Sequence, residues 1–127
     1  MKNAITLPEP LAGEAEPYCL FGTAEAKPGL GDALGERLLA LVEPTRAESG
    51  ALQYHVHRDR NNPNLFAFYE AWESIEHLKK HLATPYITAF LNDRMRFLEN
   101  DMTIHFVRMA SRYPDPLNGT CDSRCRP

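Results

Sequence analysis

The stretch LFAFYEAW, residues 65–72, decides the fold of this chain of 127 residues. Side chains alternate between the two faces of an extended strand, and here both sets are apolar. One face carries Phe66, Phe68 and Trp72, and the other carries Leu65, Ala67 and Tyr69. A strand that is apolar on both faces is typical of the interior of a sheet covered on both sides. The sequence therefore predicts a central strand at 65–72.

The residues before this strand predict its partner. From Leu52 onward the pattern has a period of two, with Leu52, Tyr54 and Val56 on one face and polar side chains on the other. The run Asn61-Asn62-Pro63-Asn64 between the two strands is a dense turn signal. We therefore expect the two segments to form a β-hairpin.

A strand and a helix are predicted before the hairpin. Residues 18–27 begin with the apolar run YCLF and end at Pro28-Gly29, which is typical of a strand. Leucines at helical spacing then predict a helix from Leu30 to Val42. Pro44 should end or kink that helix, because proline lacks a backbone donor.

Two short helices and a strand are predicted after the hairpin. Ser74 is a suitable N-cap for a helix at 75–82, and Thr84-Pro85 is a suitable start for a second helix. A last strand is expected at 102–109. The resulting order, β-α-β-β-α-β with the second helical region in two pieces, predicts a ferredoxin-like α+β fold. Its sheet is antiparallel and four-stranded, with the helices on one face.

Proline placement predicts the limits of the folded unit. Prolines gather at both ends of the chain, which indicates an N-terminal arm at 1–17, a folded domain at 18–111 and a C-terminal tail at 112–127. Because the central strand is apolar on the face away from the helices, we expect a second copy of the chain to cover that face. The sequence thus predicts a homodimer.

Composition excludes several classes of protein. Lys and Arg number 14 and Asp and Glu 17, a net charge of −3, which argues against nucleic-acid binding. The longest apolar runs are five residues, whereas a membrane span needs about 20. The three cysteines do not form a disulfide framework: Cys19 is expected to be buried, and whether Cys121 and Cys125 pair stays open. No secretory signal is visible, so a cytoplasmic location is expected.

Among the titratable side chains, the histidines attract attention. His55 and His57, and His77 and His81, have spacings that suit a metal, but neither pair has a local third ligand, so no metal is expected. His81 falls at the edge of the apolar sector of its helix, where an imidazole can reach a cavity and act as a general base or a hydrogen-bond anchor. Tyr54, Tyr69 and Trp72 are expected to line one apolar pocket there.

The stretch WESIEHLKKHLATPY, residues 72–86, resembles the antibiotic biosynthesis monooxygenase family, whose pattern is Trp-Glu-Ser followed by His-Leu-x-Thr-Pro. Residues 42–50 and Gln53-Tyr54 are similar to the family's helix end and second strand, and the resemblance covers roughly residues 18–110. It implies a dimeric α+β barrel made of two ferredoxin-like units. It also implies an enzyme that oxidises phenols or quinols without metal or flavin, although other members degrade haem or isomerise a phosphorylated signal.

The resemblance implies a role for each matched residue. His81 would be the catalytic base or anchor, Trp72 a catalytic pocket wall, and Tyr54 and Tyr86 polar contacts to substrate. Two positions differ from the family. Phe68 stands where polyketide-oxidising members have Asn, and Gly22 stands where haem-degrading members have Asn. Both differences favour a hydrophobic quinol or aromatic ligand, with Phe68 and Tyr69 as further substrate contacts.

The leading hypothesis is a cofactor-independent monooxygenase that uses molecular oxygen to oxidise a small aromatic, phenolic or quinol substrate. Two alternatives need the same apolar pocket with a polar end. One is an isomerase of a small carbonyl metabolite, and the other is a dimer that binds a small ligand without changing it.

Overall fold

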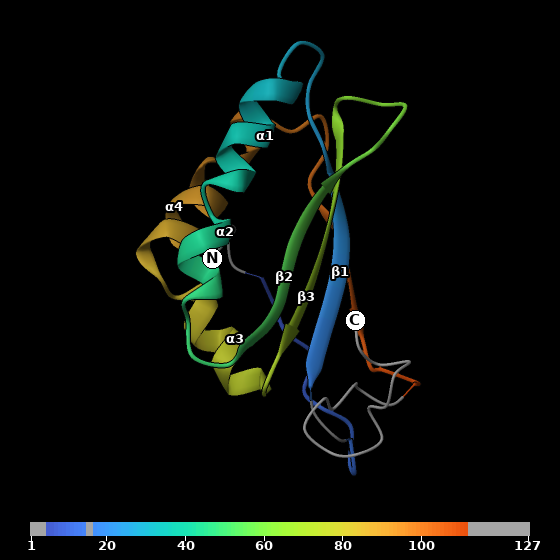
Figure 1. Ribbon diagram of the computed structural model, residues 1–127, viewed down its shortest axis with the longest axis vertical. Helices are drawn as coiled ribbons and strands as arrows, with labels where there is room; N and C mark the ends of the chain where they lie inside the picture. The colour runs from blue at the N-terminus through green and yellow to red at the C-terminus, as the bar shows by residue number, and fades with distance from the viewer. Residues whose placement is uncertain (1–4, 15–16, 112–127) are drawn as a thin grey trace, which may run out of the picture.

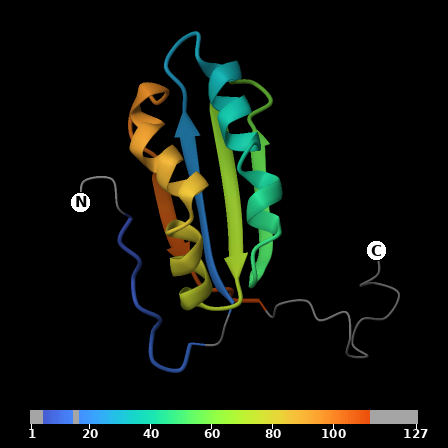
Figure 2. The same ribbon diagram turned by 90° about the vertical axis from the view of Figure 1, so that its left-hand side faces the viewer.

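The computed structural model describes residues 5–14 and 17–111. In this part of the chain, one antiparallel sheet carries helices on a single face (Figures 1 and 2). Its elements are β1 (Tyr18–Glu25), α1 (Gly31–Leu39), α2 (Val42–Arg46), β2 (Ala51–Arg58), β3 (Leu65–Trp72), α3 (Ile75–Leu82), α4 (Pro85–Asp93), the 3-10 helix η1 (Arg94–Arg96) and β4 (Thr103–Val107). The predicted ferredoxin-like α+β fold is confirmed.

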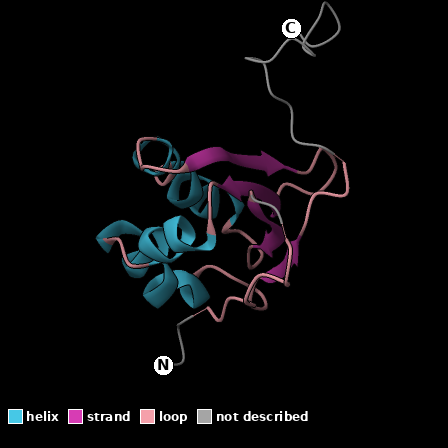
Figure 3. Cartoon of the chain, turned by 90° about the horizontal axis from the view of Figure 1, so that it is seen from below, coloured by secondary structure: helices cyan, strands magenta, loops and turns pink. Residues whose placement is uncertain are grey.

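The four strands lie in the order β2-β3-β1-β4, so β3 is interior, as predicted. Its register decides which side chains face the helices: Phe68 lies opposite Val56 of β2 and Gly22 of β1, and Glu70 lies opposite Tyr54 of β2. The even-numbered residues of β3 therefore face the helices, and the odd-numbered ones face away. Figure 3 shows the two layers, helices on one side and strands on the other.

The first helical region differs from the prediction of one helix from Leu30 to Val42. Helix α1 ends at Leu39, and a separate α2 begins at Val42. Pro44 lies in the first turn of α2, where backbone N–H groups have no partner within the helix and proline is tolerated. Proline therefore belongs to the start of a new helix and does not end the first.

The second helical region is confirmed as two helices. Ser74 caps α3, since its Oγ accepts a hydrogen bond from the backbone N–H of His77 at 3.4 Å. Thr84 is the N-cap residue of α4, but the expected side-chain cap is wrong there. Its hydroxyl donates to the carbonyl of His81 at 2.8 Å and so ties the two helices together.

The core fills the space between the helices and the inner face of the sheet. Its most buried side chains include Trp72, Leu34, Leu78 and Leu98. The outer face of the sheet is more exposed: Phe21 there is 46% exposed, and its ring packs against His105 with 5.0 Å between ring centroids. Cys19 also lies on the outer side but is buried, as expected, and accepts a bond from the Tyr69 hydroxyl at 3.5 Å.

The N-terminal segment at residues 5–14 runs past the helices beside β4 (Figure 2). Ile5 and Leu7 pack against the core, and the Tyr18 hydroxyl donates to the Pro8 carbonyl at 2.5 Å. The predicted tail with Cys121 and Cys125 lies outside the described residues. In the described ranges, no helix is long and apolar enough to cross a membrane.

Candidate active site

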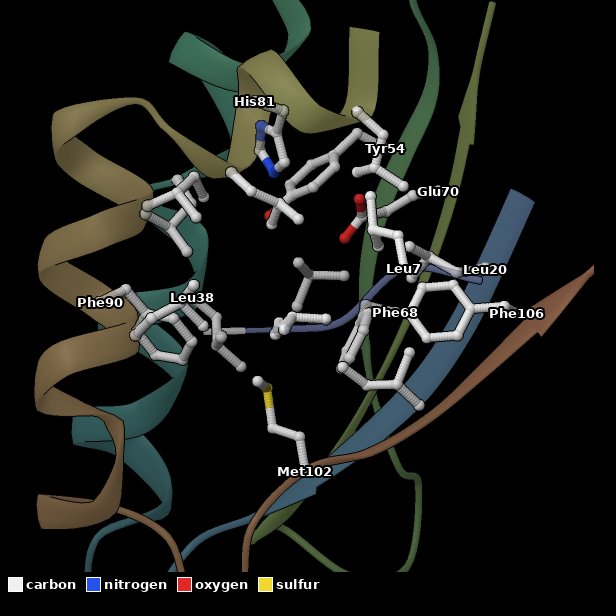
Figure 4. A pocket seen from close by; sticks show the side chains of 18 residues that line it. Leu7, Leu20, Leu38, Tyr54, Phe68, Glu70, His81, Phe90, Met102 and Phe106 are labelled. Atoms are coloured by element: carbon white, nitrogen blue, oxygen red, sulfur yellow. The ribbon is translucent and has the colours of Figure 1, made fainter. Parts of the chain in front are cut away.

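A cavity of about 60 Å³ lies between the inner face of the sheet and the helices. Most of its lining is aliphatic or phenyl. Three polar side chains gather at one end, Tyr54 from β2, Glu70 from β3 and His81 from α3 (Figure 4). An apolar cavity with a few convergent polar groups is the usual composition of a small-molecule site.

His81, in the last turn of α3, is the most buried of the three, with 2% of its surface exposed. Its Nδ1 lies 2.9 Å from Oε2 of Glu48, which belongs to the turn between α2 and β2. The Tyr86 hydroxyl donates to the same carboxylate oxygen and so helps to fix it. Figure 4 shows the imidazole turned into the cavity.

The electrostatics of His81 favour a neutral ring. Burial lowers its pKa below the usual value of 6.5, while the Glu48 carboxylate acts in the opposite direction and offsets only part of that effect. At neutral pH the ring is therefore uncharged, with its Nδ1–H donating to Glu48. This tautomer leaves the lone pair of Nε2 free on the other side of the ring. The arrangement is that of a general base oriented by a carboxylate.

Two aromatic rings pack against His81. The Trp72 ring lies at 4.7 Å between centroids and 36° from parallel, and the Tyr54 ring lies edge-on at 5.7 Å. Tyr54 lines the cavity, and burial raises the pKa of its phenol, so the hydroxyl stays protonated. Trp72 is fully buried behind His81 and does not line the cavity, so its predicted place as a pocket wall is wrong.

Glu70 is a site residue that the sequence reasoning missed. Its Oε1 accepts a hydrogen bond from Trp72 Nε1 at 3.0 Å, and only 8% of the residue is exposed. Burial raises its pKa to about 7, with a further contribution from the charge of Glu48, although the Trp72 bond acts in the opposite direction. A signal was available: Glu70 is the single acid on the face of β3 that otherwise carries Phe66, Phe68 and Trp72.

The other residues predicted to contact substrate do not all line the cavity. Phe68 lines the cavity. Tyr86 donates to Glu48 and to the Pro44 carbonyl and does not line the cavity, so it is linked to His81 through the Glu48 carboxylate. Tyr69 lies opposite His55 on the outer face of the sheet, so the prediction that it shares a pocket with Tyr54 is wrong. The register of β3 places adjacent residues on opposite faces.

Gly22 and Phe68, the two departures from the family pattern, prove to be linked. They lie directly opposite each other on β1 and β3. A Cβ added at Gly22 would lie 2.8 Å from the Phe68 ring and 2.3 Å from the Thr103 carbonyl oxygen of β4. The phenyl ring thus occupies the space that a side chain at position 22 would need. The cavity is apolar here as a result.

The two histidine pairs do not converge. His77 turns to Ser74, with Nδ1 at 2.8 Å from Oγ, whereas His81 turns to Glu48. His55 lies on the outer face, with Nε2 2.5 Å from the Gln53 side-chain oxygen. Over residues 5–14 and 17–111, no group of three or more His, Cys, Asp or Glu side chains is arranged to hold a metal ion.

Comparison with known proteins finds relatives of this chain and of its fold. The protein sll1783 of Synechocystis is 27% identical over 105 residues, which are 83% of this chain and 71% of that protein. The crystal structure of PA3566 from Pseudomonas aeruginosa is 35% identical, with a TM-score of 0.72 over 76% of this chain and 97% of that one. A crystal structure named antibiotic biosynthesis monooxygenase is 26% identical, with a TM-score of 0.69 over 74% of this chain and 99% of that one.

One family pattern covers the site itself. Residues 17–93 match the family described as "Antibiotic biosynthesis monooxygenase", a range that includes β1 and extends to the end of α4. It contains Tyr54, Glu70, Trp72 and His81, together with Glu48. Because the match spans more than half of the chain, the protein belongs to the antibiotic biosynthesis monooxygenase family.

Proposed function

We propose that this protein is a cofactor-independent monooxygenase that oxidises a small phenolic or quinol substrate with molecular oxygen. The observation that carries the proposal is the state of His81, an uncharged imidazole bound to Glu48 through Nδ1, on the wall of an apolar cavity. The family described above supports a monooxygenase. The phenolic substrate is inferred from the chemistry of the lining, because apolar side chains with a base at one end suit an aromatic ring that carries one acidic hydroxyl.

The first step assigned to the site is removal of the phenolic proton by His81 Nε2. The ring of the substrate would lie against the apolar lining, with Phe68 as one contact, and its hydroxyl would lie at the polar end. The imidazolium that forms is stabilised by the Glu48 carboxylate at Nδ1 and by the π-face of Trp72. Both groups stabilise the charged ring more than the neutral one, which favours proton transfer.

The remaining steps use electrons from the substrate alone. The phenolate gives one electron to oxygen, and the resulting phenoxyl radical and superoxide combine at a ring carbon that carries hydrogen. His81 returns its proton to the peroxide anion, and the hydroperoxide loses water to leave a quinone. One oxygen atom enters the quinone and the other becomes water, so 1-naphthol and oxygen give naphthoquinone and water. Exclusion of bulk water protects the anion and the radicals.

We also propose that the functional unit is a homodimer joined through the outer face of the sheet. Phe21 is exposed there, and Ala67 and Tyr69 lie beside it on β3. An apolar sheet face of this kind is suited to an isologous contact with a second copy. Light scattering at micromolar concentration is expected to give about twice the chain mass of 14.4 kDa. A mass equal to that of one chain would refute the dimer. The Phe21→Lys variant should have a mass closer to that of one chain than the wild type has.

The monooxygenase proposal is tested by oxygen uptake with hydroquinone, 1,4-dihydroxynaphthalene and 1-naphthol, each corrected for reaction without protein. His81→Asn keeps a donor for Glu48 and removes Nε2, so uptake should fall about 100-fold, the usual loss for a general base. His77→Asn, on the same helix but with separate partners, should leave uptake unchanged. Trp72→Phe should lower uptake by a smaller factor, because it removes the indole that packs on His81.

Three results would contradict the proposal. If oxygen uptake is unchanged in both His81→Asn and Trp72→Phe, this site does not carry out the reaction. Turnover of a carbonyl compound without oxygen would indicate the isomerase. A raised melting temperature with a ligand recovered unchanged, and no uptake with any substrate of the panel, would indicate a binding protein.

A further inference from the structure

Glu70 is a buried acid of the site that takes no part in the reaction steps described above. It extends from β3 into the same cavity as His81, and Figure 4 shows its carboxyl group at the polar end, below the imidazole. Among the residues that the structure describes, only Oε1 has a hydrogen-bond partner, Trp72 Nε1 at 3.0 Å. Within the described ranges, neither an ion pair nor a bond to Oε2 accompanies it. An acid buried without a cation is costly to the fold unless it is protonated.

The groups around Glu70 favour the protonated acid. The titratable side chains that line the cavity with Glu70 are Tyr54 on β2 and His81 on α3, and the charge of Glu48, in the turn before β2, acts on Glu70. The side chains that β1 and β4 contribute to the cavity are apolar: Leu20, Ile104 and Phe106. No lysine or arginine lines the cavity among the described residues. Burial and the charge of Glu48 raise the pKa of Glu70 to about 7, so much of it carries a proton at neutral pH.

We infer that Glu70 is a second catalytic residue of this site, the general acid that donates a proton while His81 acts as the base. The inference rests on the proposed function, since it assigns the acid that the last step of that reaction requires. The geometry behind it is the shared cavity and the shared contact with Trp72, which donates to Glu70 and packs on His81. Trp72 is a positioning residue for both groups.

The step assigned to Glu70 is the loss of water from the hydroperoxide. His81 Nε2 takes the proton from the ring carbon that carries the peroxide, and the electron pair of that C–H bond forms the new C=O bond. The O–O bond breaks, and the departing hydroxide takes the proton of Glu70 to become water. The carbon is oxidised and the peroxide oxygen is reduced. The cycle closes when the imidazolium returns one proton to the Glu70 carboxylate.

Glu70→Gln is the sharpest variant, because it keeps the size of the side chain and an oxygen to accept from Trp72 while removing the acidic proton. With 1-naphthol, kcat should fall about 100-fold while KM changes less than twofold. In the wild type, kcat should fall as the pH rises through about 7, because Glu70 must be protonated to act. Trp72→Phe removes a bond that lowers the pKa of Glu70, so that fall should move to higher pH. Glu76→Gln, at an exposed position on α3, is the matched control.

Infrared difference spectra of the protein without substrate test the acid by itself. The carbonyl band of a protonated carboxyl should disappear between about pH 6 and 8 in the wild type and in Glu76→Gln, and be missing in Glu70→Gln. The inference is overturned if the band is still present in Glu70→Gln, or if this variant keeps kcat within twofold. If the wild type takes up no oxygen with 1-naphthol, the proposed function fails, and the infrared result alone decides whether Glu70 holds a transferable proton.

Discussion

At the residue scale, the reactivity of this site depends on what holds His81. Burial lowers the pKa of the ring, and one carboxylate oxygen of Glu48 acts against that effect at 2.9 Å. The same oxygen accepts from Tyr86. A side chain in one turn therefore sets both the tautomer and the basicity of a histidine that lies 33 positions later in the sequence.

Replacing Glu48 tests this arrangement. Glu48→Gln removes the charge that raises the pKa of His81 and leaves the burial that lowers it, so the pKa should move further below 6.5. Imidazole signals in nitrogen-15 NMR spectra between about pH 4 and 8 report this shift, and kcat should fall about 10-fold, as for other second-layer partners of histidine. Glu73 lies next to His77 and serves as the control, so Glu73→Gln should leave the His81 signals unchanged. A His81 pKa that rises or stays constant in Glu48→Gln would contradict the account.

Sequence patterns predicted some of these residues and not others. The helical phase of 75–82 placed His81 at the edge of an apolar sector, and the structure turns its ring inward. Glu70 was open to prediction from the alternation of β3. Glu48 was not, because its role depends on a turn brought against α3 by the packing of distant elements. Trp72 was predicted as a pocket wall, whereas it packs against His81 and does not line the cavity, because the alternation of a strand does not show which side chains lie between a buried ring and a cavity.

At the element scale, β3 organises the site because its inner face carries Phe68, Glu70 and Trp72 in succession. Its apolar pattern and the hairpin before it predicted the sheet correctly. The split between α1 and α2 was not predicted, since leucine spacing continues across the break between Leu38 and Leu41. The close approach of β1 to its neighbours depends on Gly22, which periodicity cannot identify.

Gly22→Ala tests the packing of the strands. The added Cβ would lie 2.3 Å from the Thr103 carbonyl oxygen, so the backbone of β4 must shift. We expect the free energy of unfolding in urea to fall by about 1–3 kcal/mol, the usual cost of overpacking. Gly29→Ala is the comparison: its φ of +85° strains alanine, but nothing lies within 4 Å of the new Cβ. A Gly22→Ala protein that loses less stability than Gly29→Ala would contradict the packing described here.

At the scale of the whole molecule, the size of the cavity limits what can enter. Its volume of about 60 Å³ is well below the roughly 150 Å³ of an apolar cavity that binds benzene. Ile5 and Leu7 of the N-terminal segment form part of the lining. The segment is held by the bond from Tyr18 to Pro8 and by Glu9, whose carboxylate lies 3.9 Å from Lys79 Nζ. Ile5 and Leu7 line the cavity from outside the sheet and the helices.

Shortening these two side chains should therefore admit larger rings. The double variant Ile5→Ala and Leu7→Ala is expected to bind 1-naphthol several-fold more tightly than the wild type in a fluorescence titration. Leu11→Ala, at a side chain that is 58% exposed, is the control and should leave the affinity unchanged. An affinity that is equal or weaker in the double variant would show that the N-terminal segment does not limit the cavity.

The most direct measurement for the whole account is the fate of isotopic oxygen. The protein is supplied with 1-naphthol under ¹⁸O₂, and the quinone is analysed by mass spectrometry. We predict one ¹⁸O atom in each quinone molecule, and formation of this product about 100-fold slower in His81→Asn. A quinone without the isotope, or one that forms equally fast in His81→Asn, would contradict the assignment of this site to cofactor-independent oxygenation.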